Sequence, residues 1–474
     1  MMRSLFSGVS GLQNHQTRMD VVGNNIANIN TTGFKKNRAN FQDLLYQQLT
    51  GAARPTEDIG GVNPKEVGLG MSIASIDTLH TQGSLQSTGV NTDLAISGQG
   101  FFVLREGQNE LYTRAGAFNI DSNGTLVNPA NGMKVQGWQA REINGEPVIE
   151  VSRSTENLLI PVGGKDPARV TSRVEYACNL NKLTPYIAEG ETDPRAIADG
   201  TWNTEINIYD TFGRVHILQI QFTRVPDTPN AWTATAVVDP EAAAPTNTAV
   251  GLGEAPPAAG DANAFTVNFT NNGTIFSAVD AAGNTSGGEL PPDGARPLIT
   301  MNVAYDVPAT DPDAAGEQVR QVFTVDFGEM GGFTRALTQF ADPSSTKAIR
   351  QNGNTMGYLE SFKIDSSGLI TGVYTNGTDR PLAQIALATF ANQGGLEKAG
   401  DTAFVASNNS GTANIGPANI AGKGKIIAGT LEMSNVDMAA EFTDMIVTQR
   451  GFQANSRTIQ TADQLLQELL TLKR

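Results

Sequence analysis

The sequence has little of what a catalytic or metal-binding protein needs. It holds one cysteine, Cys178, and three histidines, His15, His80 and His216, which lie far apart along the chain. An internal disulfide is therefore impossible, and no Cys/His spacing matches a structural metal site. The sequence also has no P-loop and no Gly-x-Ser-x-Gly elbow. These absences predict no cofactor, no metal and no turnover enzyme.

Long apolar runs and basic clusters are also scarce. No run approaches the ~20 residues that cross a bilayer, so we expect no membrane insertion. Residues 1–12 have no sustained apolar core and no secretory cleavage site. We therefore expect either a cytoplasmic chain or export without a cleaved signal peptide. The formal net charge is −15, and the only short basic cluster is Lys35, Lys36 and Arg38. This balance argues against nucleic acid as a partner.

What the sequence has instead is a seven-residue apolar repeat at each end. Such a repeat forms one seam along a helix, and that seam needs a partner. We therefore predict two assembly helices. Their seam residues are Leu5, Leu12, Met19 and Ile26 near the start, and Met438, Met445, Phe452, Ile459 and Leu466 near the end.

Neither helix has the composition of a stable isolated coiled coil. Gly8, Gly11 and Gly23 weaken the first helix by roughly 1 kcal/mol each relative to Ala. The alternate seam positions of the second helix are polar, as at Glu441 and Thr448, which a closed two-stranded coil disfavours. We expect helices that order on assembly, in a crowded tube of like helices. A simple intramolecular helix pair is the alternative.

The stretch between the helices is rich in Gly, Asn, Asp, Thr and β-branched residues, which is typical of strands and turns. The length of 474 residues suggests about three domains. We predict a multidomain, mainly β protein whose terminal α-helices form a coiled-coil-like inner domain, with two nested β-rich domains. The expected parts are a helical inner core (1–30 and 440–474), an extended linker (31–72 and 430–439), an inner β domain (73–168 and 346–429) and an outer inserted β domain (169–345).

Several segments resemble the flagellar rod–hook axial protein family. The matching segments are Ser7–Leu12 and Val22–Lys35 at the start, Asp93–Val103 and Tyr112–Phe118 in the β-rich part, and Leu431–Asp437 and Met445–Asn455 near the end. The resemblance implies a self-assembling subunit that a type III apparatus exports unfolded, with helices lining a tube and β domains facing outward. The central insertion points to the hook branch, whose curved flexible tube is a universal joint that transmits torque from rod to filament.

The same resemblance implies the partners and the location. The partners are further copies of the chain in a helical homopolymer, the distal rod protein, the hook cap, the hook–filament junction protein, the type III export apparatus and the hook-length ruler. The location is the flagellar hook, which is periplasmic if the source is a spirochaete. The alternatives are a distal rod protein of the basal body and, from another class, a secreted β-rich adhesin or hydrolase.

The lone cysteine and the start Met1–Phe6 resemble spirochaete hook proteins in particular. That resemblance implies lysinoalanine cross-links between neighbouring subunits. A Cys loses its sulfur as hydrogen sulfide, and a neutral Lys amine adds to the resulting dehydroalanine. Cys178 is the expected cysteine, Lys165 the expected nucleophile, Asn179 a helper and Lys182 a competing nucleophile. The alternative is that Cys178 is a buried strand residue and Lys165 a solvated loop charge.

Overall fold

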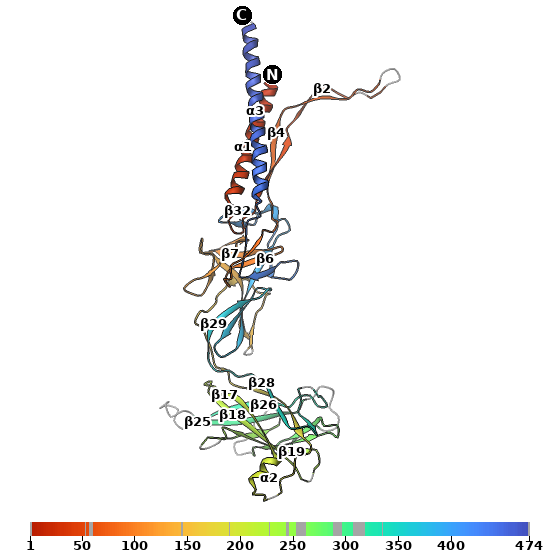
Figure 1. Ribbon diagram of the computed structural model, residues 1–474, viewed down its shortest axis with the longest axis vertical. Helices are drawn as coiled ribbons and strands as arrows, with labels where there is room; N and C mark the ends of the chain where they lie inside the picture. Colours follow the sequence, from red (N-terminus) through yellow and green to blue (C-terminus); the bar gives the residue numbers. More distant parts are fainter. Residues whose placement is uncertain are drawn as a thin grey trace. The chain divides into compact units, whose positions relative to one another are not determined.

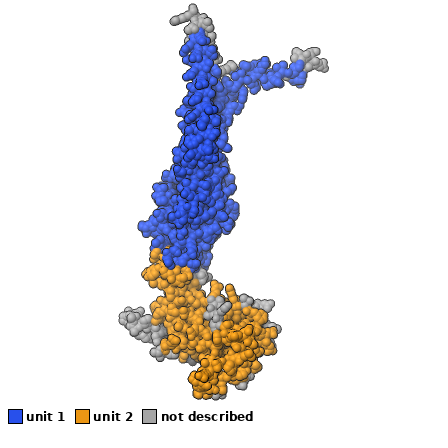
Figure 2. Space-filling view, viewed as in Figure 1, with its two compact units in different colours: residues 1–162, 360–373, 379–474 blue, residues 163–359, 374–378 orange. Residues whose placement is uncertain are grey.

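The computed structural model describes residues 2–472, except 53, 56–59, 144–145, 189, 227, 243–245, 253–261, 288–295, 307–317 and 334. The fold is mainly β, with one long helix near each end of the chain (Figure 1). This confirms the predicted fold class. The chain forms two compact units, coloured separately in Figure 2: unit 1 is 1–162, 360–373 and 379–474, and unit 2 is 163–359 and 374–378. The finer four-part division stays a prediction.

The two long helices of unit 1 lie side by side (Figure 1). They are α1 (Met2–Ala27) and α3 (Met438–Leu472). Asp437 precedes α3, and its Oδ1 accepts a hydrogen bond from the Ala439 backbone N–H at 2.9 Å. This side-chain bond satisfies a free N–H at the helix start. The intramolecular helix pair is therefore present in the single chain.

An extended arm follows α1 in unit 1. Strand β1 (Asn37–Asp43) pairs antiparallel with β4 (Met71–Thr78), and β2 (Tyr46–Thr50) pairs with β3 (Lys65–Gly68). Every residue of β2 and β3 is exposed, and the hairpin projects away from the helix pair (Figure 1).

The β part of unit 1 is built on one antiparallel sheet in the order β30-β31-β11-β7-β8-β33-β32. Aromatic side chains from this sheet, including Phe101, Tyr112 and Trp138, form a buried cluster. The pairs β5–β36 and β6–β35 tie this part to the chain just before α3. The elements are β5 (Leu85–Ser87), β6 (Leu94–Ser97), β7 (Phe101–Glu106), β8 (Asn109–Thr113), β9 (Asn119–Ile120), β10 (Leu126–Val127), β11 (Lys134–Gln139), β12 (Arg141–Ile143), β13 (Glu146–Val148), β14 (Glu156–Asn157), β30 (Leu369–Tyr374), β31 (Asp379–Thr389), η1 (Gln393–Gly395), β32 (Glu397–Gly400), β33 (Ala403–Val405), β34 (Asn414–Pro417), β35 (Lys425–Ala428) and β36 (Thr430–Glu432).

Unit 2 is a β-sandwich. One sheet has the order β21-β25-β26-β16-β27, with β28 also pairing β16, and the other has the order β17-β18-β19-β22-β23-β24, with β20 also pairing β19. Side chains from both sheets fill one apolar core. The elements are β15 (Lys165–Asp166), β16 (Arg173–Asn181), α2 (Pro194–Gly200), β17 (Thr201–Tyr209), β18 (Val215–Arg224), β19 (Ala231–Val238), β20 (Thr246–Asn247), β21 (Ala249–Gly251), β22 (Ala264–Phe269), β23 (Ile275–Val279), β24 (Thr285–Gly287), β25 (Leu298–Asp306), β26 (Gln318–Asp326), β27 (Thr338–Phe340) and β28 (Ser345–Gln351). Strand β29 (Gly357–Ile364) begins in unit 2, and its residues from 360 onward belong to unit 1.

Candidate assembly surface and cross-linking residues

The contact between α1 and α3 runs through small and polar side chains. Among the described side chains of α3, the buried ones are Glu441, Thr448 and Ala462, which belong to the alternate series of the heptad. Asn25 of α1 is buried too, and its Nδ2 donates a hydrogen bond to Glu441 Oε2 at 3.1 Å. A buried polar pair of this kind fixes the register of two helices at some cost in stability.

The apolar seam series is only partly covered within this helix pair. Phe6 of α1 and Phe442 and Ile446 of α3 are more than one-third exposed as well. Apolar side chains exposed on two adjacent helices form a surface that further helices can cover. The role of the seam series in assembly stays a prediction. Its half-buried members are Leu5, Leu12, Met19, Ile26, Met445, Phe452, Ile459 and Leu466, and its exposed member is Met438.

Two of the three glycines of α1 allow the helices to approach closely. A Cβ atom added at Gly11 would lie 2.6 Å from Asn455 Nδ2, and one at Gly8 would lie 3.0 Å from Ile459 Cγ1. At Gly23 an added Cβ would meet nothing within 4 Å. Gly8 and Gly11 therefore make room for α3, whereas Gly23 has no such packing role in the single chain.

Three charged side chains of unit 1 form a buried ionic triad. Lys35 comes from the segment after α1, Glu432 from the segment before α3, and Arg114 from the residue after β8. Glu432 Oε1 accepts from Lys35 Nζ at 2.6 Å, and Glu432 Oε2 accepts from Arg114 Nη1 at 3.2 Å. The side chains of Lys35 and Glu432 are fully buried, and that of Arg114 is 3% exposed. Burial lowers the pKa of Lys35, and the Glu432 carboxylate opposes this shift. Lys35 Nζ also donates to the Thr81 carbonyl at 2.7 Å.

The triad was missed from the sequence, where Lys35 counted only as part of a basic cluster. Each member lies in a different one of the three segments that carry the family resemblance: Lys35 at the start, Arg114 in the β-rich part and Glu432 near the end. The presence of one of these charged residues in each of the three parts was the sequence signal that could have indicated the triad. The triad explains physically how these distant segments are held together, because a buried charge requires a partner.

Cys178 lies on β16 and points into the sandwich core. Its neighbours on the same face of the strand, Tyr176 and Leu180, are also buried. Burial raises the pKa of the Cys178 thiol to about 12. The thiol is therefore un-ionised and shielded in the single chain. Its alternative description as a buried strand residue is correct for this state.

The backbone around Cys178 has one incomplete edge. On one side, β28 pairs with β16 over Val174–Asn179. On the other side, β26 pairs only with 173–175, and β27 pairs only with 179–181. The residues 176–178 thus have no strand partner on that side among the described residues. The Cys178 carbonyl accepts a hydrogen bond from Thr338 Oγ1 at 3.4 Å.

The other two expected cross-linking residues lie on different elements. Lys165 is exposed on β15, whose partner strand is β29, and its cross-strand neighbour is Tyr358. No described hydrogen bond, ion pair or ring contact joins Lys165 to Cys178 within the chain. Asn179 lies beside β27: its Oδ1 accepts from the Phe340 N–H at 3.0 Å, and its Nδ2 donates to the Asp342 carbonyl at 3.2 Å. The competing nucleophile, Lys182, is exposed one residue beyond β16.

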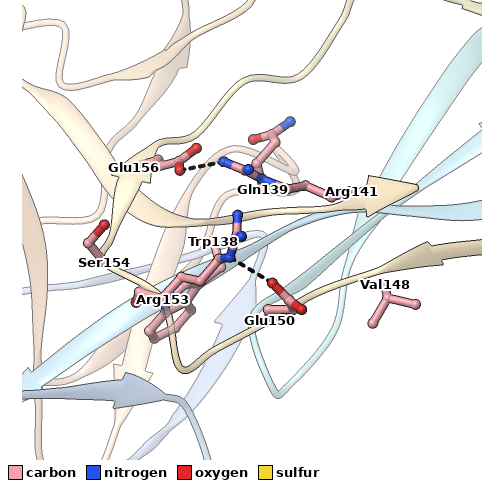
Figure 3. Close-up of a pocket in the computed structure, with 8 residues that line it drawn as sticks. All are labelled: Trp138, Gln139, Arg141, Val148, Glu150, Arg153, Ser154 and Glu156. Atoms are coloured by element: carbon pink, nitrogen blue, oxygen red, sulfur yellow. Dashed lines mark hydrogen bonds and ion pairs between the residues drawn. The ribbon is translucent and has the colours of Figure 1, made fainter. Parts of the chain in front are cut away.

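A small pocket beside Trp138 has charged walls (Figure 3). Two ion pairs line it, Arg141 with Glu156 and Arg153 with Glu150, each at 2.7 Å. Its volume of about 10 Å³ accommodates no more than a water molecule. Both carboxylates are engaged by arginines, which leaves no free acid or base for catalysis. Among the residues that the structure describes, no group of His, Cys, Asp and Glu is placed to hold a metal ion.

Comparisons with known proteins define the class first. Four family models match in chain order: "Flagella basal body rod protein" over 5–35, "Flagellar hook protein FlgE/F/G D1 domain" over 95–165, "Flagellar basal body protein FlaE D2 domain" over 179–354, and "Flagellar basal body rod FlgEFG protein C-terminal" over 427–472. These matches identify an axial protein of the bacterial flagellum. Over the described residues, no helix is long and apolar enough to cross a membrane.

Individual relatives narrow the class. The chain is 57% identical to the flagellar hook protein FlgE of Treponema pallidum and 51% identical to that of Borreliella burgdorferi, in each case over the full length of both chains. A crystal structure of Helicobacter pylori FlgE2 covers 73% of this chain and 100% of its own, at a TM-score of 0.50 and 15% identity, and supports the fold alone. The chain belongs to the flagellar hook protein FlgE family. It is a structural protein of the flagellum.

Proposed function

We propose that this chain polymerises into the flagellar hook, a curved flexible tube that transmits torque from rod to filament. The observation that carries this proposal is the similarity to two spirochaete hook proteins, at 57% and 51% identity over the full length. By the same family likeness, its partners are further copies of itself, the distal rod protein, the hook cap, the hook–filament junction protein, the export apparatus and the hook-length ruler. The hook is then periplasmic, and the chain is exported without a cleaved signal peptide.

The helix pair supports this polymer physically. One end of the pair is held by a buried polar contact between Asn25 and Glu441, while apolar side chains such as Phe6, at 67% exposure, remain uncovered. Covering these side chains with helices of neighbouring copies releases water from apolar surface. An open helical tube requires such heterologous contacts, in which each subunit offers two different surfaces.

The proposal includes a covalent bond between neighbouring subunits. Cys178 loses its Cα proton and its Cβ–S bond breaks, so that hydrogen sulfide leaves and dehydroalanine remains. The neutral Nζ of Lys165 from a second copy then adds to Cβ, and a proton returns to Cα. Only hydrogen sulfide is lost overall, and no oxidant is needed. The lysine amine is the nucleophile, so it must be unprotonated when it attacks.

The burial of Cys178 gives this reaction a condition. At 5% exposure, the Cβ atom is not accessible to an amine from outside the sandwich. The edge of β16 at 176–178 must therefore open when subunits assemble. Its incomplete pairing beside the three-residue strand β27 makes this a weak edge.

The test is mass spectrometry of tubes assembled from the full chain and boiled in detergent and thiol. We expect a peptide pair joined through positions 178 and 165 that lacks one hydrogen sulfide. Lys165→Arg should abolish the pair, whereas the matched variant Lys182→Arg should retain it. Tubes that dissolve to monomers with intact Cys178 would remove the covalent chemistry. Deletion of residues 1–30 should prevent assembly, and normal tubes after this deletion would overturn the polymer proposal.

A further inference from the structure

An aromatic and acidic surface lies beside Cys178 in unit 2. The rings of Phe333 and Phe340 stack with centroids 6.3 Å apart, although the side chains are 66% and 38% exposed. Asp342, two residues after Phe340, is exposed. The Asn179 amide binds the backbone of both Phe340 and Asp342. We call Phe333, Phe340 and Asp342 the acceptor patch.

A complementary surface surrounds Lys165. The Lys165 Nζ lies 5.7 Å from the centroid of the Tyr358 ring. Tyr358 and Met356 are each 47% exposed, so an apolar surface with one cation faces solvent. We call Lys165, Tyr358 and Met356 the donor patch.

The two patches have complementary charge, and each exposes aromatic surface to solvent. Among the described residues, neither Lys165 nor Asp342 forms an ion pair. The donor patch therefore carries one unpaired positive charge, and the acceptor patch carries one unpaired negative charge. Each patch also exposes aromatic surface, and aromatic rings contribute strongly to protein interfaces. The two patches lie on different elements. The donor patch lies on β15 and at the start of β29, and the acceptor patch lies on β27 and the loops on either side of it, so one chain carries both halves of a head-to-tail contact.

We propose that the donor patch of one copy docks on the acceptor patch of a second copy. This inference rests on the proposed polymer and names the contact that would precede its cross-link. Docking brings the Lys165 amine beside the Cys178–Asn179 peptide, because Asn179 holds Phe340 and Asp342 in place. Asn179 thereby acts as a positioning residue.

The direct test uses a photo-crosslinking phenylalanine analogue at position 358 in the full chain. The background is Cys178→Ala, so that no lysinoalanine forms, and light- and heavy-isotope copies are mixed before assembly. We expect mixed-isotope adducts from 358 to residues 333–342. The matched control places the analogue at Ile217, which is 38% exposed on the same unit and should give no adduct to 333–342. Adducts from 358 to other segments, or none in formed tubes, would overturn the docking.

Charge reversal gives a second readout in chains that retain Cys178. Asp342→Lys opposes Lys165 and should lower the yield of the lysinoalanine peptide about tenfold, as charge pairs set association at an interface. Asp199→Lys, at another exposed acid of unit 2, should leave the yield unchanged. Equal yields from the two variants would contradict the acceptor patch. The two proposals fail separately: adducts without lysinoalanine refute the cross-link, and lysinoalanine with adducts elsewhere refutes the docking.

Discussion

The buried triad Lys35–Arg114–Glu432 makes an unequal prediction for its members. It holds two cations against one carboxylate, and all three side chains are at most 3% exposed. Glu432→Gln keeps the side-chain shape but leaves both cations without an anion. We expect this variant to lose about 3–5 kcal/mol in the free energy of unfolding, the range for breaking a buried ion pair.

Lys35→Met should cost less. It leaves Arg114 and Glu432 as a balanced pair, and it removes the hydrogen bonds of Lys35 to the Glu432 carboxylate and the Thr81 carbonyl, together about 2–3 kcal/mol. The lowered pKa of Lys35 agrees with this smaller cost. Burial lowers this pKa despite the adjacent carboxylate, so the ion pair does not fully offset the desolvation of the lysine. A surface control is Glu156→Gln, whose pair with Arg141 is about half exposed and should contribute no more than about 1 kcal/mol.

Urea unfolding followed by hydrogen exchange of peptides from residues 94–118 reports on unit 1 separately from unit 2. The expected order of destabilisation is Glu432→Gln, then Lys35→Met, then Glu156→Gln. If Lys35→Met were as harmful as Glu432→Gln, the triad would not be an excess of buried cations, and the reasoning would be refuted.

Three further predictions concern single positions. Gly23→Ala should stabilise the helix pair by about 1 kcal/mol, whereas Gly11→Ala should destabilise it through contact with Asn455. The loss of helical circular dichroism on heating compares the two variants, and an equal gain in melting temperature for both would contradict the packing. Cys178 should react with iodoacetamide at least ~100-fold more slowly than a free thiol until urea unfolds unit 2, because burial raises its pKa to about 12; rapid labelling of the native chain would oppose this. Burial, with nearby cations adding, lowers the pKa of His80 from 6.5 to about 4, so the unfolded state binds the proton first and stability should fall as pH drops from 6.5 to 4. His80→Gln should reduce the dependence of the melting temperature on pH over that range. An unchanged dependence would rule out this histidine as the cause.

The sequence by itself determined the kinds of element and their order. Seven-residue periodicity predicted a helix at each end, and the structure places them at Met2–Ala27 and Met438–Leu472. Strand-forming runs such as Leu94–Ile96 and Phe101–Leu104 fall on β6 and β7. These features follow from the sequence because side-chain period and turn chemistry act within a few residues. The family motifs were readable for the same reason.

Only the tertiary structure decided which residues meet. The periodicity left open how deeply each heptad series is buried. The packing buries Glu441, Thr448 and Ala462 more deeply than the apolar series, although Ile459 of the apolar series lies close to Gly8. Lys35 and Glu432 are 397 positions apart, so no local pattern could pair them. The inward direction of Cys178 likewise depends on which face of β16 the second sheet covers. Contacts of this range are set by the burial of charge and apolar surface in three dimensions, which a linear pattern does not contain.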